Sequence, residues 1–258
     1  MQIQSISNNQ IYTKRPAHTN FRAWRNAVLD PKKTHLIGDK PKHMNNTAFF
    51  RLGKMWENFI KFILTKYKNV EKVNVYNYGC SDGSEPLSLA MILKSRYKDI
   101  AEKFLPIIAK DYDTCAIDKA NTREYVIGQF EKGDINKFTN NEFNRYFDKK
   151  RRIDSAHELC VLKPELYKDV EFSVADVLDD IENIKPNNSF VMARNFWPYL
   201  SDEDKVFLAS KLYKRFDKNC TLMIGEFDLS NRWSILDITT VLKQAGFKPT
   251  KSDMIFEK

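Results

Sequence analysis

The stretch Tyr78-Gly79-Cys80-Ser81-Asp82-Gly83-Ser84-Glu85-Pro86 decides the fold of this chain. It follows an alternating run of strand-forming residues at 73–78 and leads into residues 86–93, which are largely apolar and favour a helix. A glycine-rich turn between a first strand and its helix lets the backbone approach a ligand closely, at the carboxyl end of an open α/β sheet. The stretch therefore predicts a ligand-binding crevice in an α/β protein.

The residues of this turn limit the class of ligand. Gly79 and Gly83 do not have the Gly-x-Gly-x-x-Gly spacing of a dinucleotide fold, and no Gly-Lys-Ser/Thr follows them to hold a phosphate. Glu85 places a negative charge beside the crevice, which suits a cationic ligand such as S-adenosylmethionine, with its sulfonium and ammonium groups. The same glutamate can equally be an acid in the first helical turn that complements the helix dipole.

A second acidic position follows the next predicted strand, residues 105–111. Asp111 ends this strand, where a carboxylate can accept hydrogen bonds from both ribose hydroxyls of an adenosine-type ligand. Asp113 competes for this role. Either acid could instead cap the helix that is predicted over residues 114–125.

The remaining pattern alternates between strands and helices, which predicts a parallel sheet. Apolar residues at helical spacing predict a buried helix over residues 46–67, beginning near Asn46 or Thr47. Further strands are expected at residues 170–174, 189–193 and 221–225, with a helix at 202–216 and a final helix and strand ending at Lys258.

The chain divides into an arm and one main domain. Residues 1–44 are polar, basic and broken by prolines, and predict an N-terminal arm with one short helix. Residues 45–258 form the main domain. Within it, residues 126–170 are charged and rich in turns, as expected of a small inserted subdomain.

Composition favours a cytoplasmic protein with no membrane insertion. Its 258 residues can bury a large core, and no stretch approaches the ~18 consecutive apolar residues of a membrane span. The formal charge of +8 is scattered along the chain. The histidines show no metal-ligand spacing, and the four cysteines suggest neither a disulfide framework nor a metal site: Cys80, Cys115, Cys160 and Cys220.

Four segments resemble motifs of the CheR-type chemotaxis receptor methyltransferases, which move a methyl group from S-adenosylmethionine to receptor glutamates. Asn45–Arg51 is similar to Asn-x-Thr-x-Phe-Phe-Arg, and Gly79–Pro86 to Gly-Cys-Ser-Thr-Gly-Glu-Glu-Pro. Ala109–Thr114 is similar to Ala-Thr-Asp-Ile-Asp-Thr, and Ala193–Leu200 to Cys-Arg-Asn-Val-x-Ile-Tyr-Phe. The resemblance covers roughly residues 45–258 and implies a Rossmann-like S-adenosylmethionine-dependent methyltransferase fold.

The resemblance also implies the cofactor, S-adenosyl-L-methionine, its product, S-adenosyl-L-homocysteine, and a protein substrate that bears an acceptor glutamate. Asp111 would hold the ribose, and Glu85 would meet the methionine end. Asp176 and Val177 would flank the adenine. The cofactor-binding positions carried over from the motifs are Asn45, Thr47, Arg51, Gly79, Glu85, Asp111, Asp176, Val177, Arg194 and Asn195.

Arg51, Arg194 and Tyr199 are predicted to be catalytic because they lie in the motifs nearest the implied methyl group. An arginine could offset negative charge and the tyrosine could orient the acceptor, although all three could instead have structural roles. Methylation of a carboxylate is a direct displacement, and a glutamate with a reference pKa near 4.3 is already anionic at neutral pH, so no general base is needed.

Departures from the family pattern leave two other functions open. Ser84 replaces a glutamate, Asp176 replaces an asparagine, and residues 1–44 are shorter than the helical N-terminal domain with which the family engages receptors. One alternative is amino-group methylation of nucleic acid or protein, because Asn195–Tyr199 is one residue longer than an Asn-Pro-Pro-aromatic motif and Phe21–Arg25 could contact nucleic acid. The other is a non-catalytic S-adenosylmethionine-binding module.

Overall fold

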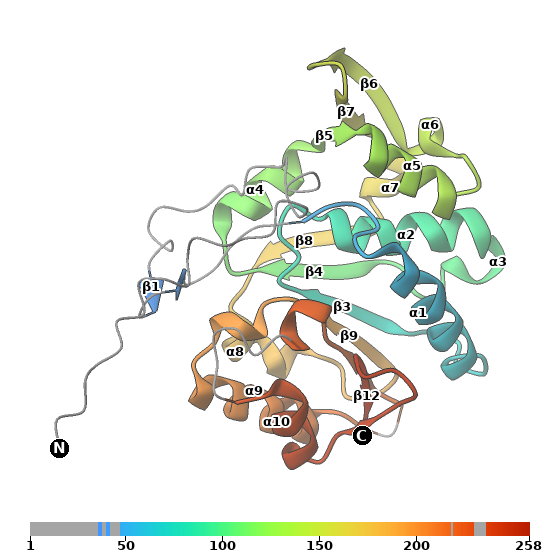
Figure 1. Ribbon diagram of the computed structural model, residues 1–258. Helices are drawn as coiled ribbons and strands as arrows, with labels where there is room; N and C mark the ends of the chain where they lie inside the picture. Colours follow the sequence, from blue (N-terminus) through green and yellow to red (C-terminus); the bar gives the residue numbers. More distant parts are fainter. Residues whose placement is uncertain (1–35, 38–39, 42–46, 218, 230–235) are drawn as a thin grey trace, which may run out of the picture.

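The computed structural model describes residues 36–37, 40–41, 47–217, 219–229 and 236–258. Its main sheet has seven strands in the order β11-β12-β10-β9-β3-β4-β8 (Figure 1). The strands β10, β9, β3, β4 and β8 run parallel, whereas β12 is antiparallel to both of its neighbours. The bounds are β3 (Asn74–Tyr78), β4 (Ile107–Asp111), β8 (Val170–Val174), β9 (Ser189–Ala193), β10 (Thr221–Met223), β11 (Lys248–Pro249) and β12 (Ile255–Glu257).

This sheet confirms the predicted α/β class and its Rossmann-like topology. From β3 the chain moves outward to β4 and β8, and then returns to place β9 on the other side of β3. The strand order therefore reverses between β3 and β9, and ligands of open α/β sheets bind at such a point, beyond the carboxyl ends of the strands. Tyr78 pairs with both Lys110 and Ala193, so the central strands end at one edge.

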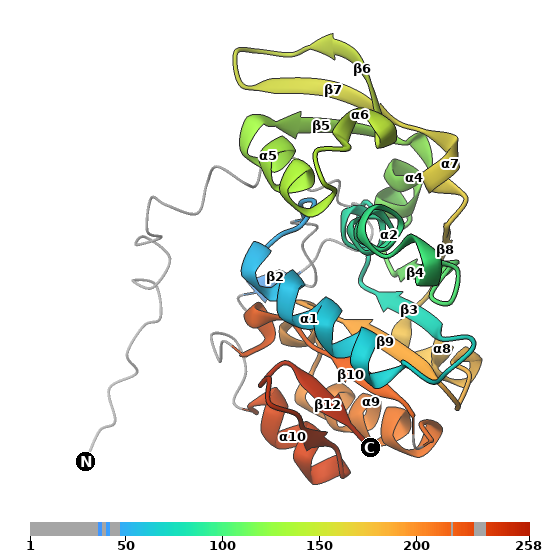
Figure 2. The same ribbon diagram turned by 90° about the vertical axis from the view of Figure 1, so that its right-hand side faces the viewer.

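Helices cover both faces of the sheet (Figure 2). Alternate side chains of β3 point to opposite faces, so Val75 joins the core under α1 (Gly53–Lys66) and α2 (Ser84–Arg96), whereas Tyr76 joins the core on the other face. That second core is closed by α9 (Asp202–Arg215) and α10 (Ile238–Ala245). Asn77 shares the face of Val75 and is a fully buried polar residue directed toward α2.

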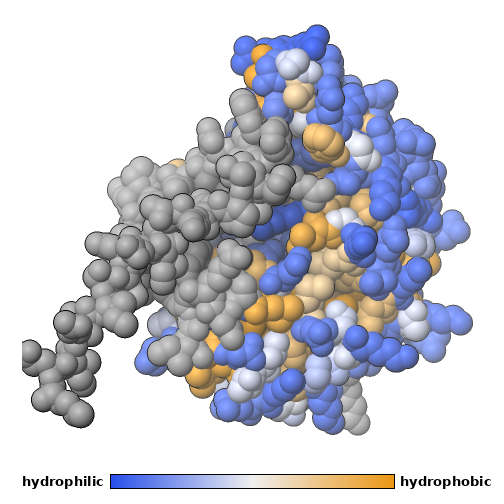
Figure 3. All heavy atoms as spheres, in the orientation of Figure 1, coloured by the Kyte–Doolittle hydropathy of each residue, from blue (hydrophilic) through white to orange (hydrophobic). Residues whose placement is uncertain are grey.

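Residues 124–162 form a separate three-stranded antiparallel sheet in the order β5-β7-β6, which lies beyond α2 (Figure 2). This region contains the bulk of the range predicted as an inserted subdomain. Its elements are β5 (Glu124–Gly128), α5 (Gln129–Phe138), α6 (Phe143–Tyr146), β6 (Phe147–Arg152) and β7 (His157–Leu162), and α7 (Pro164–Tyr167) leads back to the main sheet. In Figure 3 the surface of this sheet is mostly hydrophilic, while apolar residues gather over the middle of the main domain.

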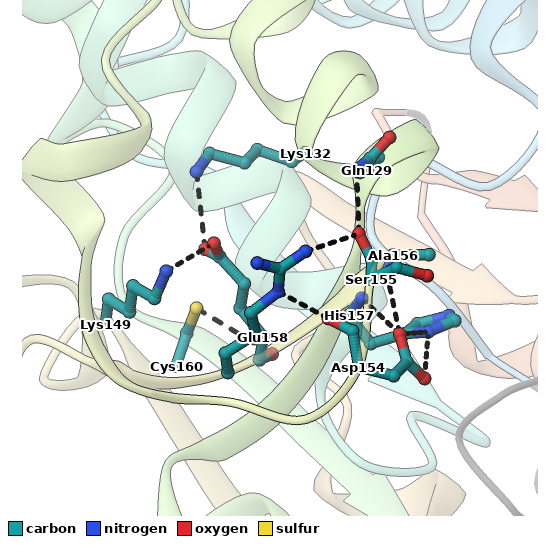
Figure 4. A network of polar contacts seen from close by, with 10 residues as sticks. Gln129, Lys132, Lys149, Asp154, Ser155, Ala156, His157, Glu158 and Cys160 are labelled. Carbon is teal, nitrogen blue, oxygen red and sulfur yellow. Dashed lines mark hydrogen bonds and ion pairs between the residues drawn. The ribbon is translucent and has the colours of Figure 1, made fainter.

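Polar contacts hold the outer part of this small sheet together (Figure 4). Glu158 accepts hydrogen bonds from Lys149 at 2.7 Å and from Lys132 at 3.5 Å. Asp154 accepts the backbone N–H groups of Ala156 and His157 and so closes the loop between β6 and β7. The edge strand β6 carries exposed basic residues and an irregularity between Lys149 and Arg151, features that oppose the addition of a further strand.

Two predicted helix boundaries are wrong for local reasons. The helix expected to begin near Asn46 or Thr47 begins instead at Gly53; Asn46 itself lies outside the described residues. Phe50 and Leu52 have positive φ values of 49° and 62°, and Phe50 is buried in a turn, which explains why the apolar pattern resembled a longer helix. The helix predicted over 114–125 is α4 (Thr114–Thr122), because Arg123 turns the chain at a φ of 58°.

Of the predicted N-terminal arm, the structure describes only β1 (Leu36–Ile37) and β2 (Lys40–Pro41), which pair antiparallel. The short helix expected there otherwise falls outside the described residues. Among the helices that are described, none is long and apolar enough to cross a membrane.

Replacing Gly83 tests how tightly the turn before α2 is constrained. Gly83 has a φ of 85°, and a Cβ added there would lie 2.6 Å from Phe172 Cε1. We expect Gly83→Ala to destabilise the protein by about 1–3 kcal/mol, measured by urea denaturation. The matched control is Gly133→Ala on α5, where a Cβ would meet nothing within 4 Å and should be neutral or stabilising. Equal stability of the two variants would contradict this description of the turn.

Candidate functional site

The turn after β3 is held in place by backbone and side-chain contacts from two other segments. Cys80 N donates to Lys110 O at 3.1 Å, and Ser81 N donates to Asp111 Oδ2 at 2.7 Å, which ties the turn to β4. From the small sheet, the Tyr125 hydroxyl donates to Asp82 O at 2.9 Å. Gly79 is exposed at the carboxyl edge with a φ of 69°. The turn is therefore rigidly placed while its first glycine faces outward.

Glu85 links the helix α2 to the strands β3 and β9. It lies in the first turn of α2, accepts from Asn77 Nδ2 at 2.9 Å through Oε1, and forms an ion pair through Oε2 with Arg194, which follows β9. The Arg194 side chain is fully buried and that of Glu85 is 17% exposed. The carboxylate thus has structural partners on one side and a limited exposed surface on the other.

The two acids after β4 have different surroundings. Asp111 is 8% exposed, and its two oxygens accept the backbone N–H groups of Ser81 and Asp113, at 2.7 and 2.8 Å. Asp113 is fully buried and caps α4 by accepting the N–H of Cys115 at 2.9 Å. Asp113 is therefore a helix cap, whereas Asp111 lies at the carboxyl edge of the sheet.

Asp176 and Val177 follow the end of β8 and are half-buried. The N–H of Ala175 donates to Asp111 O at 3.0 Å, so this segment lies beside the end of β4. Asp176 caps α8 (Val177–Asp180) by accepting the N–H of Leu178.

The last residue of α8 ties that helix to the sheet. Asp180 lies 2.7 Å from Lys110 Nζ and 2.5 Å from the Tyr78 hydroxyl. Both of these partners come from the central strands, so α8 is fixed against the sheet together with Asp176 at its start.

The three residues predicted to be catalytic lie in one electrostatic cluster. Burial and then the charge of Arg194 lower the pKa of Arg51 from its ordinary value of 12.5. The charges of Glu85, Tyr199 and Asp228 act on Arg51 in the opposite direction. Burial raises the pKa of Tyr199 to about 12, so its hydroxyl is protonated at neutral pH. Arg51 therefore lies within electrostatic range of the Arg194–Glu85 ion pair and of Tyr199, which belongs to the 3-10 helix η3 (Trp197–Tyr199).

Asp228 belongs to this cluster and was missed by the sequence analysis. It lies in η4 (Glu226–Leu229), is 4% exposed, and accepts through Oδ2 the N–H groups of Asn195 and Gly225, each at 2.7 Å. Burial raises its pKa to about 7, against the opposing effects of these hydrogen bonds and of Arg194. The available signal was its position: an acid three residues after Gly225, the glycine that ends the predicted strand 221–225.

Asn195 is held by the same group of contacts. It has a φ of 62°, and its Oδ1 accepts the N–H of Phe227 at 3.1 Å. A Cβ on Gly225 would lie 2.1 Å from Asn195 Oδ1, so only glycine leaves room for this amide.

The remaining predicted positions lie before α1. Thr47 is half-buried, whereas Asn45 lies outside the described residues. Two contacts hold the chain that follows Thr47: Phe49 N donates to Glu131 Oε1 at 2.7 Å, and Phe50 N donates to Ser88 Oγ at 2.9 Å. Glu131 and Tyr125, both from the small sheet region, were not predicted to support the site.

This edge has the donors and acceptors that a zwitterionic, cationic nucleoside ligand requires. Glu85 and Asp111 supply carboxylates, and four buried polar atoms there have no hydrogen-bond partner among the described residues: Asn77 Oδ1, Arg194 Nε, Arg194 Nη2 and Asp228 Oδ1. Buried polar atoms are seldom left unpaired. The chemistry of this donor set fits S-adenosylmethionine. Within the described ranges, no group of three or more His, Cys, Asp or Glu is arranged to hold a metal ion.

Comparison with known proteins agrees with this geometry. The profile of the CheR methyltransferase SAM-binding domain matches residues 45–235. Chemotaxis protein methyltransferase 2 of Vibrio cholerae serotype O1 is 24% identical over 214 residues, which are 81% of this chain and 71% of that protein. The chemotaxis protein methyltransferase of Listeria monocytogenes serovar 1/2a is 23% identical over 184 residues, 70% of this chain and 64% of that protein.

Among solved structures, the chain is similar to the magnesium protoporphyrin IX methyltransferase of Synechocystis PCC 6803 with bound SAM. The TM-score is 0.42 and the sequence identity 13%, over 79% of this chain and 77% of that one. The family match covers most of this chain and includes all four sequence motifs, so the predicted family and cofactor are confirmed. The chain belongs to the CheR methyltransferase family and contains its S-adenosylmethionine-binding domain.

Proposed function

We propose that this protein transfers the methyl group of S-adenosylmethionine to a glutamate side chain of a chemoreceptor-type protein, forming a methyl ester. The observation that carries the proposal is the meeting of Arg51, Arg194 and Tyr199 at the carboxyl edge of the sheet. Two guanidinium groups and a protonated hydroxyl suit an anionic acceptor. The names of the chemotaxis methyltransferase relatives support a chemoreceptor as the protein that carries this acceptor.

The proposed cofactor contacts follow the order of the strands. Glu85 would bind the ammonium group through oxygen lone pairs that Asn77 and Arg194 do not use. Asp111 is oriented by its two backbone hydrogen bonds and would accept hydrogen bonds from the ribose hydroxyls through its remaining oxygen lone pairs. Asp176 and Val177 would flank the adenine beyond β8. Five further positions would complete the cofactor contacts: Thr47, Arg51, Gly79, Arg194 and Asn195. Of these, Arg194 and Asn195 would lie beside the methionine end, while Asn45, also implied by the family motif, lies outside the described residues.

The acceptor carboxylate would be drawn to Arg51 and oriented by the Tyr199 hydroxyl. Placing the half-buried Arg51 near a second cation is electrostatically costly, and an incoming carboxylate would offset that cost. One acceptor oxygen then attacks the methyl carbon, and the bonding electrons stay with sulfur. The cofactor supplies the activated methyl group. Because the acceptor is already anionic, alignment and exclusion of water carry the reaction, and alignment can contribute roughly 7–11 kcal/mol.

The amino-group alternative is not favoured by this site. A lysine amine of a protein acceptor, which is cationic until it loses a proton, would be repelled by Arg51 and Arg194. Trp197 stands where an Asn-Pro-Pro-aromatic motif has its second proline, and its indole is buried and donates to Ala193 O at 2.8 Å. The family match likewise favours carboxylate methylation.

Methyl transfer from radiolabelled S-adenosylmethionine to a chemoreceptor signalling fragment from the source organism tests the proposal. We expect label on protein that is released as methanol in mild alkali, because methyl esters hydrolyse there. Alkali-stable label would indicate amine methylation instead. Cofactor binding in calorimetry without transfer to the fragment or to source proteins would support the non-catalytic module.

Replacing each of the two acids at the end of β4 by asparagine tests the proposed ribose contact. Asp111→Asn should weaken S-adenosylmethionine binding by at least about tenfold, because an amide replaces a charged acceptor. Asp113→Asn should leave binding nearly unchanged, since asparagine also caps helices well. Calorimetry measures both dissociation constants. Equal weakening in the two variants would remove Asp111 from the proposed ribose site.

Tyr199→Phe tests the orientation of the acceptor. The hydroxyl is lost while the ring can still pack against Phe227, whose centroid is 6.1 Å away. We expect kcat to fall about tenfold or more with little change in cofactor affinity, because a donor to the reacting carboxylate is removed. Tyr213→Phe, on α9, is the matched control and should keep native kcat. Native turnover by Tyr199→Phe would remove this hydroxyl from the mechanism.

A further inference from the structure

We infer that Asp228 is a positioning residue for the reaction, one that fixes the Asn195 turn and sets the net charge that Arg51 and Arg194 present to the acceptor. This inference rests on the proposed function. It concerns a residue beyond the carboxyl end of β10, a region that lies outside the four sequence motifs and to which the proposed mechanism assigns no role.

The geometry ties three segments to one carboxyl oxygen. Asp228 Oδ2 accepts the N–H of Asn195, after β9, and the N–H of Gly225, after β10. The Asn195 amide oxygen returns a contact to η4 by accepting the N–H of Phe227. These three hydrogen bonds close a loop between the ends of two parallel strands. Arg194 directly precedes this turn, and its side chain is paired with Glu85.

Asp228 interacts electrostatically with Arg51 and Arg194. Asp228 Oδ1 is buried and has no hydrogen-bond partner within the described part of the chain. The same is true of Nε and Nη2 of Arg194, which attracts Asp228 electrostatically. Asp228 also acts on Arg51 and on Tyr199. One buried carboxyl group therefore influences all three residues proposed to act on the acceptor.

Counting charges shows what the protonation of Asp228 would change. With Asp228 ionised, Arg51 and Arg194 are balanced by Glu85 and Asp228. With Asp228 protonated, the cluster carries one net positive charge and favours an anionic acceptor. In the helix α10, which packs against η4, the charged groups are Asp237, which caps that helix, and Lys243.

The pKa of Asp228, raised to about 7 by burial, supports a change within the range in which the protein can be assayed. Tyr199, at about 12, stays protonated there. A glutamate acceptor stays ionised above its reference pKa of ~4.3. Because the folded protein binds this proton more tightly than the unfolded chain, the associated stability is present at low pH and is lost as the pH rises through about 7.

The test compares native protein, Asp228→Asn, Asp228→Ala and the exposed neighbour variant Glu226→Gln at pH 6, 7 and 8. Asparagine keeps an oxygen for the two backbone N–H groups and stays neutral, so it imitates the protonated acid. We expect the native KM for the acceptor to rise by up to about tenfold from pH 6 to pH 8, as one positive charge is offset. We expect Asp228→Asn to keep a low KM throughout, and Glu226→Gln to follow the native protein.

Asp228→Ala separates positioning from charge. It is also neutral, but it leaves the N–H groups of Asn195 and Gly225 without an acceptor, so kcat should fall while that of Asp228→Asn is retained. A pH-dependent KM in Asp228→Asn equal to that of the native protein would overturn the charge role. Native kcat in a folded Asp228→Ala would overturn the positioning role.

Thermal unfolding without cofactor or acceptor gives a readout independent of the reaction. The melting temperature of the native protein should fall relative to that of Asp228→Asn between pH 6 and pH 8, and parallel curves would contradict the inference. Should the native protein form no methyl ester at any pH, the proposed function fails, whereas the melting curves still decide whether Asp228 titrates in this range.

Discussion

The ion pair between Arg194 and Glu85 is the constraint on which the rest of the site depends. It joins Arg194, which follows β9, to Glu85 in the first turn of α2. Taking two charges out of water costs several kcal/mol per ion, and removing one partner of a buried pair typically costs 3–5 kcal/mol. Because the desolvation of the two charges offsets much of their attraction, the pair is a poor source of stability by itself. The pair lies at the reversal of strand order, the place where open α/β sheets bind ligands.

Other polar groups are arranged around this pair so that charges of opposite sign alternate. Asn77 holds the second oxygen of Glu85, and Asp228 offsets the charge of Arg194 from the far side. With Asp228 ionised, Arg51 completes a cluster of two positive and two negative charges. This arrangement places the buried guanidinium of Arg194 near the half-buried Arg51, and an acceptor with a negative charge of its own would be attracted to both.

Sequence patterns predicted those parts of the fold and site that local chemistry determines. The turn after β3, Asp111 after β4 and Arg194 after β9 each follow a recognisable strand, and parallel strands bring their ends to one edge. The start of α1 was mispredicted because Phe50 is buried in a turn and looks apolar in either conformation. Asp228 was missed because its partner Asn195 lies 33 residues away in sequence, and only the folded chain shows that pairing.

A crystal structure of the protein with S-adenosylhomocysteine tests the central claim most directly, since it places the cofactor product among the residues that should hold it. The account predicts the amino-acid end beside Glu85 and the Arg194–Asn195 turn, the ribose hydroxyls on Asp111, and the adenine against Asp176 and Val177. A product molecule bound away from the carboxyl edge of β3 and β4, or contacts to neither Glu85 nor Asp111, would contradict it.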